Sequence, residues 1–144
     1  MIIQRRMMIT ILNKQEVAVQ KEQDVVPFRN LVKEYAVKAG MSILNQTKLI
    51  TAASELVRNM LKYGGGGVVL IESVNNGRDN GVRLSFIDKG PGIADIAQAM
   101  KDGFSTGKSL GLGLPGTRRI VNEFEISSIV GQGTTVSVIK WKNG

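Results

Sequence analysis

Histidine and cysteine are both absent from this sequence of 144 residues. Without cysteine, the chain cannot form a disulfide scaffold, use a thiolate nucleophile or build a zinc site that needs sulfur. Without histidine, it has no imidazole general base, no Ser-His-Asp triad, no histidine metal ligand and no phosphohistidine. Any chemistry of this chain must therefore use carboxylates, amides, hydroxyls, lysine, arginine and backbone groups.

Long apolar runs are absent as well. No segment approaches the roughly 20 apolar residues that a membrane-spanning helix needs. The apolar run from Met7 to Leu12 is too short for the core of a signal peptide, and polar residues follow it directly. We therefore expect no membrane association and a cytoplasmic location.

Acidic residues are fewer than basic ones: 12 Asp and Glu stand against 19 Lys and Arg, a net charge of +7. Such a balance can indicate nucleic-acid binding. The charge is spread evenly, however, and no basic run is interleaved with aromatic residues. A generally basic surface that meets an acidic partner or a nucleotide is the preferred interpretation, and we expect no nucleic-acid partner.

The length, and a hydrophobic content of 42%, favour one domain over residues 1–144. Apolar periodicity and Gly or Pro signals predict two short strands within 7–19, helices over 24–39 and 43–63, strands over 68–74 and 82–88, short helices over 94–100 and 115–124, and strands over 126–130 and 134–141. This order predicts an α+β fold, a two-layer sandwich of a largely antiparallel mixed sheet packed against helices.

Glu55 and Asn59 are the first candidate functional residues. They lie four residues apart in the second predicted helix and so project from the same face. One interpretation is a solvated helix face, with Glu55 paired to Arg58 or Lys62. The other is a polar pocket, in which the amide oxygen ligates Mg²⁺ and the carboxylate orients a water or accepts a proton.

The second candidate is the segment from Asp88 to Gly92, which directly follows a predicted strand. It could simply form a β-turn. Alternatively, the Asp88 carboxylate could accept a hydrogen bond from an exocyclic amine, while Gly92 lets a flat ring approach the backbone.

The third candidate is the segment from Gly111 to Gly116, a G-x-G-x-x-G pattern that runs into a helix. Glycines before a helix N-terminus present backbone N–H groups to phosphate. A dinucleotide-binding fold would place this pattern directly after the first strand, and here it comes late in the chain. A Walker P-loop is excluded too, because Gly103 is one residue too close to Gly107 and Lys108.

In this order, the three patterns and a late Gly133-Thr134 resemble the GHKL (Bergerat-fold) ATPase family. The runs 54–59, 88–93, 102–106 and 111–116 are most similar to the stressosome switch kinases and anti-sigma-factor kinases of that family. The resemblance covers about residues 24–141. It implies the Bergerat ATP-binding fold, with a mobile ATP lid at about residues 93–112.

The resemblance also implies roles for individual residues. Asn59 would ligate Mg²⁺, Glu55 would act as base or water-orienting group, and Asp88 would read the adenine amine. The remaining predicted nucleotide contacts are Gly90, Gly92, Ile93, Lys108, Gly111, Leu112, Gly113, Leu114, Gly116 and Thr134.

The function that the resemblance implies is an ATP- and Mg-dependent serine/threonine-protein kinase. Its substrate would be a STAS-domain partner in a stress or sigma-factor partner-switching pathway, and it would activate a PP2C-type phosphatase when released. A self-contained histidine kinase is excluded, because the chain has no histidine. The alternative is a non-catalytic ATP-binding regulator that sequesters a sigma factor or another partner.

Overall fold

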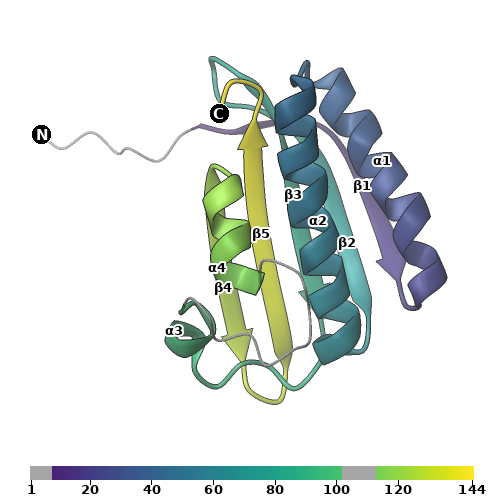
Figure 1. Ribbon diagram of the computed structural model, residues 1–144, viewed down its shortest axis with the longest axis vertical. Coiled ribbons are helices and arrows are strands. Elements are labelled where there is room, and N and C mark those ends of the chain that lie inside the picture. Colours follow the sequence, from purple (N-terminus) through teal and green to yellow (C-terminus); the bar gives the residue numbers. More distant parts are fainter. Residues whose placement is uncertain (1–7, 102–112) are drawn as a thin grey trace, which may run out of the picture.

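The computed structural model describes residues 8–101 and 113–144, and these are the described residues throughout. Ten elements follow one another along them (Figure 1). They are β1 (Thr10–Val19), the 3-10 helix η1 (Glu22–Asp24), α1 (Val25–Lys38), α2 (Ile43–Gly64), β2 (Gly67–Asn75), β3 (Asn80–Asp88), α3 (Ile96–Ala99), α4 (Gly113–Ile120), β4 (Glu123–Ile129) and β5 (Gly133–Trp141).

The strands form one five-stranded sheet in the order β1-β2-β3-β5-β4. All four neighbouring pairs are antiparallel. Strand β5 lies between β3 and β4 in the sheet (Figure 1). Helices α3 and α4 lie between β3 and β4 in the sequence. This arrangement confirms the predicted α+β class.

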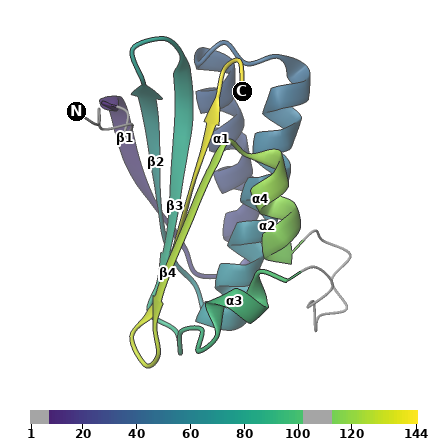
Figure 2. The same cartoon turned by 90° about the vertical axis from the view of Figure 1, so that its left-hand side faces the viewer.

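The helices cover one face of the sheet and leave the other face open (Figure 2). The core lies between the two layers, where alternate strand residues meet the apolar stripes of α1 and α2. Phe28 of α1 packs edge-on against Phe86 of β3, with ring centroids 5.9 Å apart. The apolar positions predicted for the second helix are all buried: Leu49, Ala52, Ala53, Leu56 and Met60.

The N-terminal prediction was wrong in one respect. Residues 10–19 form one continuous strand paired with β2, rather than two short strands around Asn13-Lys14. The register shifts between Ile11 and Asn13, so the chain accommodates an irregularity without leaving the sheet. Asn13-Lys14 also lacks the glycine that a tight two-residue turn usually requires.

The helix predicted over 115–124 was shifted and too long, since α4 spans Gly113–Ile120 and Phe124 belongs to β4. Asn122 ends the helical path by bonding to the sheet. Its N–H donates to the Ile139 carbonyl (2.9 Å), and its Oδ1 accepts from the Trp141 N–H (2.7 Å). These bonds align the next residues with β5, so the chain enters a strand.

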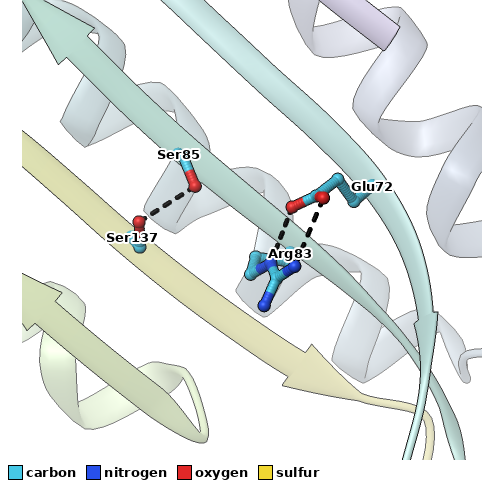
Figure 3. Close-up of polar contacts among 4 residues, drawn as sticks. All are labelled: Glu72, Arg83, Ser85 and Ser137. Carbon is cyan, nitrogen blue, oxygen red and sulfur yellow. Dashed lines mark hydrogen bonds and ion pairs between the residues drawn. The ribbon is translucent and has the colours of Figure 1, made fainter. Parts of the chain in front are cut away.

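The open face of the sheet carries polar pairs between neighbouring strands (Figure 3). Arg83 of β3 donates from Nε to Glu72 Oε1 of β2 (2.6 Å) and from Nη2 to Oε2 (3.2 Å). The Ser137 hydroxyl of β5 donates to Ser85 of β3 (2.9 Å). This face therefore combines cross-strand hydrogen bonds with a second, smaller apolar cluster of Val74, Ile139 and Trp141.

Among the described residues, no helix is both long enough and apolar enough to cross a bilayer.

Candidate nucleotide site

Helix α2 carries Glu55 and Asn59 toward the end of the molecule where β3 finishes. Ser42 caps its start by accepting the Asn45 N–H (3.1 Å). Gly65 ends it in the left-handed conformation at φ 75°, which glycine adopts without strain. Twenty-two residues of regular helix thus separate the two caps, and both candidate side chains are fixed on a rigid element.

Glu55 is buried, with an exposed fraction of 6%, and Asn59 is half-buried. The interpretation in which Glu55 pairs with Arg58 or Lys62 on a wet surface is wrong, since the ion pair formed among the described residues joins Glu72 and Arg83. No described group hydrogen-bonds the Glu55 carboxylate. Its oxygens are not among the fully buried, unsatisfied polar atoms of the described residues, so the carboxylate keeps some contact with solvent and is open to a partner.

Asp88 closes β3 beneath the end of α2. Its Oδ1 accepts hydrogen bonds from the Gly90 N–H (2.8 Å) and the Thr134 N–H (3.3 Å). A Cβ on Gly64 would lie 2.5 Å from the Asp88 Cγ, and one on Gly90 would lie 2.7 Å from the Gly64 Cα. The carboxylate therefore sits in a space that only glycines leave open, and its Oδ2 has no hydrogen-bond partner among the described residues.

The loop after Asp88 is fastened to the turn between β4 and β5. Gly131 donates its N–H to the Pro91 carbonyl (2.8 Å), and Ile93 donates its N–H to the Ser128 hydroxyl (2.7 Å). A Cβ on Gly92 would lie 2.5 Å from the Ile129 carbonyl oxygen. The segment is more than a simple β-turn, because this loop also hydrogen-bonds to the β4–β5 hairpin, which lies far along the chain.

Helix α4 lies on the same face of the sheet as α2 and contacts it (Figures 1 and 2). Pro115 and Gly116 are buried in its first turns, while Gly113 and Leu114 are half-buried. The Thr117 hydroxyl donates to the Gly113 carbonyl (2.9 Å). The N-terminal end of such a helix offers backbone N–H groups and positive dipole to an anion.

The structure thus brings Asp88, Gly90, Ile93 and Thr134 into one hydrogen-bonded unit that includes Ser128, and Gly92 lies beside it against Ile129. Glu55 and Asn59 lie on α2, whose last residue contacts Asp88. Gly113, Leu114 and Gly116 lie in α4. Lys108, Gly111 and Leu112 lie outside the described residues, as does most of the predicted lid.

Sequence reasoning missed two members of this unit, Gly64 and Ser128. Gly64 is the first glycine of the run 64–67, which the sequence shows. Its lack of a side chain leaves space for the Asp88 carboxylate. Ser128 carries no local signal, because its importance comes only from the pairing of β4 with β5.

The residues fit ATP and Mg²⁺. One carboxylate oxygen of Asp88 accepts no hydrogen bond from the described residues and would suit an adenine amine, and the Glu55 carboxylate likewise has no described partner. Among the described residues no group of three or more acidic side chains could hold a metal ion unaided. Magnesium commonly takes one or two protein ligands and completes its shell with phosphates and water, so the Asn59 amide oxygen suffices as a protein ligand.

Comparison with known proteins supports the same assignment. The serine/threonine-protein kinase RsbT of Bacillus subtilis is 42% identical over 125 residues, which are 87% of this chain and 94% of RsbT. An anti-sigma F factor of Thermoanaerobacter is 30% identical over 127 residues, covering 84% of this chain and 87% of that protein. The similarity to RsbT confirms the predicted enzyme class, a serine/threonine-protein kinase.

The fold has a solved counterpart. A crystal structure of the RsbU and RsbW domains of a Mycobacterium tuberculosis protein superposes with a TM-score of 0.63 at 21% identity, covering 89% of this chain and 31% of that one. Residues 44–143 match the protein family described as histidine kinase-, DNA gyrase B-, and HSP90-like ATPase. The chain therefore belongs to this ATPase family, which is the family that its motifs resemble, and ATP is the nucleotide that membership implies.

Proposed function

We propose that this chain is a single ATP-binding kinase domain that uses Mg-ATP to phosphorylate a serine or threonine of a STAS-domain protein. The observation that carries the proposal is Glu55 of α2, a residue only 6% exposed whose carboxylate accepts no hydrogen bond from the described residues. It stands one helical turn from Asn59 and on the helix whose end packs on Asp88. The proposed base and metal ligand thus lie on the helix whose end packs against the proposed adenine acceptor.

Mg-ATP, when bound, supplies the phosphoryl group and the charge that offsets its oxygens. Glu55 would accept the proton of the attacking hydroxyl or orient a water beside it, while the phosphoryl group passes to the hydroxyl oxygen and ADP leaves; this role needs no imidazole. Asn59 would hold the metal by its amide oxygen, and Asp88 would accept a hydrogen bond from the adenine amine. Backbone N–H groups at the start of α4, together with Lys108, Gly111 and Leu112, would bind the phosphates. Positioning and charge neutralisation of this kind account for most of the catalysis of phosphoryl transfer.

The partner assignment rests on the relatives. Their names, a serine/threonine-protein kinase and anti-sigma F factors, support a place in a stress or sigma-factor partner-switching pathway in the cytoplasm. In that pathway the released kinase would activate a PP2C-type phosphatase. With a net charge of +7, the chain is suited to an acidic protein partner.

The test is to incubate the chain with Mg-ATP and STAS-domain proteins encoded near its gene, and to map phosphate by mass spectrometry. We expect one phosphoserine or phosphothreonine on the partner. A partner that stays unmodified while it forms a stable complex would instead support the second candidate, a non-catalytic regulator that sequesters its target. That candidate is favoured by the similarity to anti-sigma F factors, and it uses the same nucleotide site.

A further inference from the structure

The end of the molecule opposite the nucleotide site carries exposed apolar side chains on a rigid helix. Ile43 and Leu44 begin α2 and are 80% and 63% exposed. The connection from α1 to α2 and the C-terminal turn both lie at this end, whereas β3 finishes at the other end (Figures 1 and 2). The 22 residues of α2 span roughly 30 Å, so the two ends are well separated.

The stability of α2 does not explain these two residues. The first turn of a helix favours acidic side chains, and α2 has none there. Ser42 already caps the helix by accepting the Asn45 N–H (3.1 Å). Ile43 and Leu44 do not pack against the apolar core either. Two large aliphatic side chains that are adjacent and exposed indicate contact with another molecule.

Three lysines lie close to this apolar pair. Lys48 follows Leu44 by one helical turn. Lys38 is the last residue of α1, and the Lys142 side chain lies against the turn that follows it. A Cβ on Gly40 would be 3.1 Å from the Lys142 Cε. None of the three lysines forms an ion pair with another described residue. Together with the apolar pair they form the distal patch: Ile43, Leu44, Lys38, Lys48 and Lys142.

The positive charge of the distal patch is not compensated by its neighbours. Glu34 lies one turn before Lys38 and makes no ion pair in the described part of the chain. Asp79 already accepts a hydrogen bond from the C-terminal turn (2.8 Å). The charge of Lys48 also reaches the buried Lys140, whose pKa it lowers. The surface that complements this patch is an apolar groove with carboxylates at its rim.

The position of the distal patch limits what a bound partner does. A phosphoryl acceptor must bring its hydroxyl to Glu55, which lies more than three helical turns from Ile43, about 18 Å along α2. A partner seated on the patch leaves the nucleotide site accessible. It can therefore be bound without being the substrate.

We propose that the distal patch is the docking surface for an acidic protein that this chain binds without phosphorylating, with Ile43 and Leu44 inserted into an apolar groove of that protein. The inference rests on the proposed function, under which this partner is the PP2C-type phosphatase. It assigns the phosphatase and the phosphorylated STAS-domain protein to separate surfaces of the chain.

The test uses the purified PP2C-type phosphatase encoded near the gene of this chain. Its affinity is measured by calorimetry, and transfer to the STAS-domain partner by phosphate incorporation. In Ile43→Glu/Leu44→Glu, phosphatase affinity should fall at least about thirtyfold while phosphoryl transfer keeps its wild-type rate. Glutamate is favourable in the first turn of a helix, so this variant should fold. Val26→Glu, the same kind of change at an exposed position in the first turn of α1, is the matched control.

Charge reversal tests whether the partner surface is acidic. Lys38→Glu/Lys142→Glu should weaken phosphatase binding about tenfold at low ionic strength and much less at high ionic strength. Lys14→Glu/Lys33→Glu makes the same change in net charge at exposed positions outside the patch and is the control. An equal effect of the two double variants would contradict a specific acidic complement.

Three outcomes would overturn the assignment of the distal patch. A phosphatase that binds Ile43→Glu/Leu44→Glu as tightly as wild type does not dock there. Loss of phosphoryl transfer in that variant with phosphatase binding intact assigns the patch to the substrate. Binding of the wild type, but not of the variant, to phosphatidylglycerol vesicles, with no binding of the phosphatase, assigns it to a membrane surface.

Failure of this inference and failure of the proposed function give different results. A wild-type chain that phosphorylates no STAS-domain protein but binds the phosphatase through Ile43 and Leu44 refutes the kinase proposal and supports the docking surface. A wild-type chain that phosphorylates its partner but does not bind the phosphatase refutes the docking surface and leaves the kinase proposal standing.

Discussion

At the scale of single residues, the burial of Glu55 matters most. An exposed glutamate on a helix would be explained by solvation alone, whereas Glu55 is 6% exposed and has no partner among the described residues. Its neighbours Arg58 and Lys62 are exposed and do not neutralise it. A glutamate held this closely against the core without an ion-pair partner is a candidate for a functional role.

Replacing Glu55 by alanine should lower phosphoryl transfer about 100- to 10,000-fold, the usual contribution of a general base. ATP affinity should stay close to that of the wild type, because the proposed nucleotide contacts lie elsewhere. Transfer is followed by phosphate incorporation into the partner, and affinity by calorimetry. Arg58→Ala, which removes an exposed charge from the next turn, is the control; equal activities of the two variants would contradict the role of Glu55.

Replacing Asn59 by alanine should weaken nucleotide binding about 10- to 100-fold in the presence of Mg²⁺. Without the metal, binding should barely change, because the amide oxygen acts only through the ion. Calorimetric titration with and without Mg²⁺ measures both quantities. Asn59→Asp retains an oxygen ligand and should preserve most of the metal dependence. A similar loss with and without metal would count against Asn59 as a ligand.

At the scale of secondary-structure elements, the sequence predicted the four α-helices and strands β2 to β5, but it divided β1 into two strands, missed the 3-10 helix η1 and misplaced boundaries that depend on distant contacts. Apolar periodicity was enough for α1 and α2. The end of α4 depended on Asn122, which bonds to the backbone of β5. No property of residues 113–124 indicates that bond, so a prediction from local pattern carried the helix too far.

The sheet itself contains an element-scale interaction that sequence could not reveal, the pair between Glu72 of β2 and Arg83 of β3 (Figure 3). The Glu72 side chain is 5% exposed and the Arg83 side chain 26%. The hydrogen bond from Arg83 to Glu72 raises the pKa of the guanidinium, an effect that partial burial opposes and nearby acidic residues reinforce. Arg83 therefore remains charged at every pH of interest.

Arg83→Met should destabilise the fold by about 2 kcal/mol, because Glu72 is left buried without its cation. The partial exposure of Arg83 places this value below that of a fully buried pair. The double variant Glu72→Leu/Arg83→Met should recover most of the loss, since no unpaired charge remains. Urea unfolding measures the free energies, and Lys14→Met, on the other side of Glu72 in the register, is the control. A double variant less stable than Arg83→Met would refute this explanation.

At the scale of the whole molecule, the stability of the fold depends on pH through a buried lysine, Lys140. This chain carries a net charge of +7, and Lys140 of β5 is only 3% exposed. Its Nζ donates to the Gly144 carbonyl (3.1 Å). Burial lowers the pKa of Lys140 below its ordinary value of 10.5, and the positive charge of Lys48 lowers it further. The charged form is thus less favourable in the folded state than in the unfolded chain.

The sign of the pH effect follows from that shift. Between the lowered folded pKa and 10.5, the unfolded chain binds more protons than the folded one, so stability rises with pH in this interval. Lys140→Met removes the cost of the buried charge and should stabilise the fold by about 1 kcal/mol at neutral pH. Its advantage should shrink as pH rises through the interval. Urea unfolding at several alkaline pH values measures the difference, with exposed Lys142→Met as control. A Lys140→Met protein that is less stable at every pH would contradict this account.

The sequence alone determined the chemical class of this protein. The absence of histidine and cysteine limited the usable groups, and the ordered motifs at Glu55, Asp88 and Gly111 resemble those of the GHKL ATPases, a resemblance that can be seen in the sequence because each motif is local. Tertiary structure decided what those residues meet. It buried Glu55, left one oxygen of Asp88 without a partner and placed Ser128 beside Thr134. Burial and hydrogen-bond partners arise from segments far apart in the chain, and no local pattern encodes them.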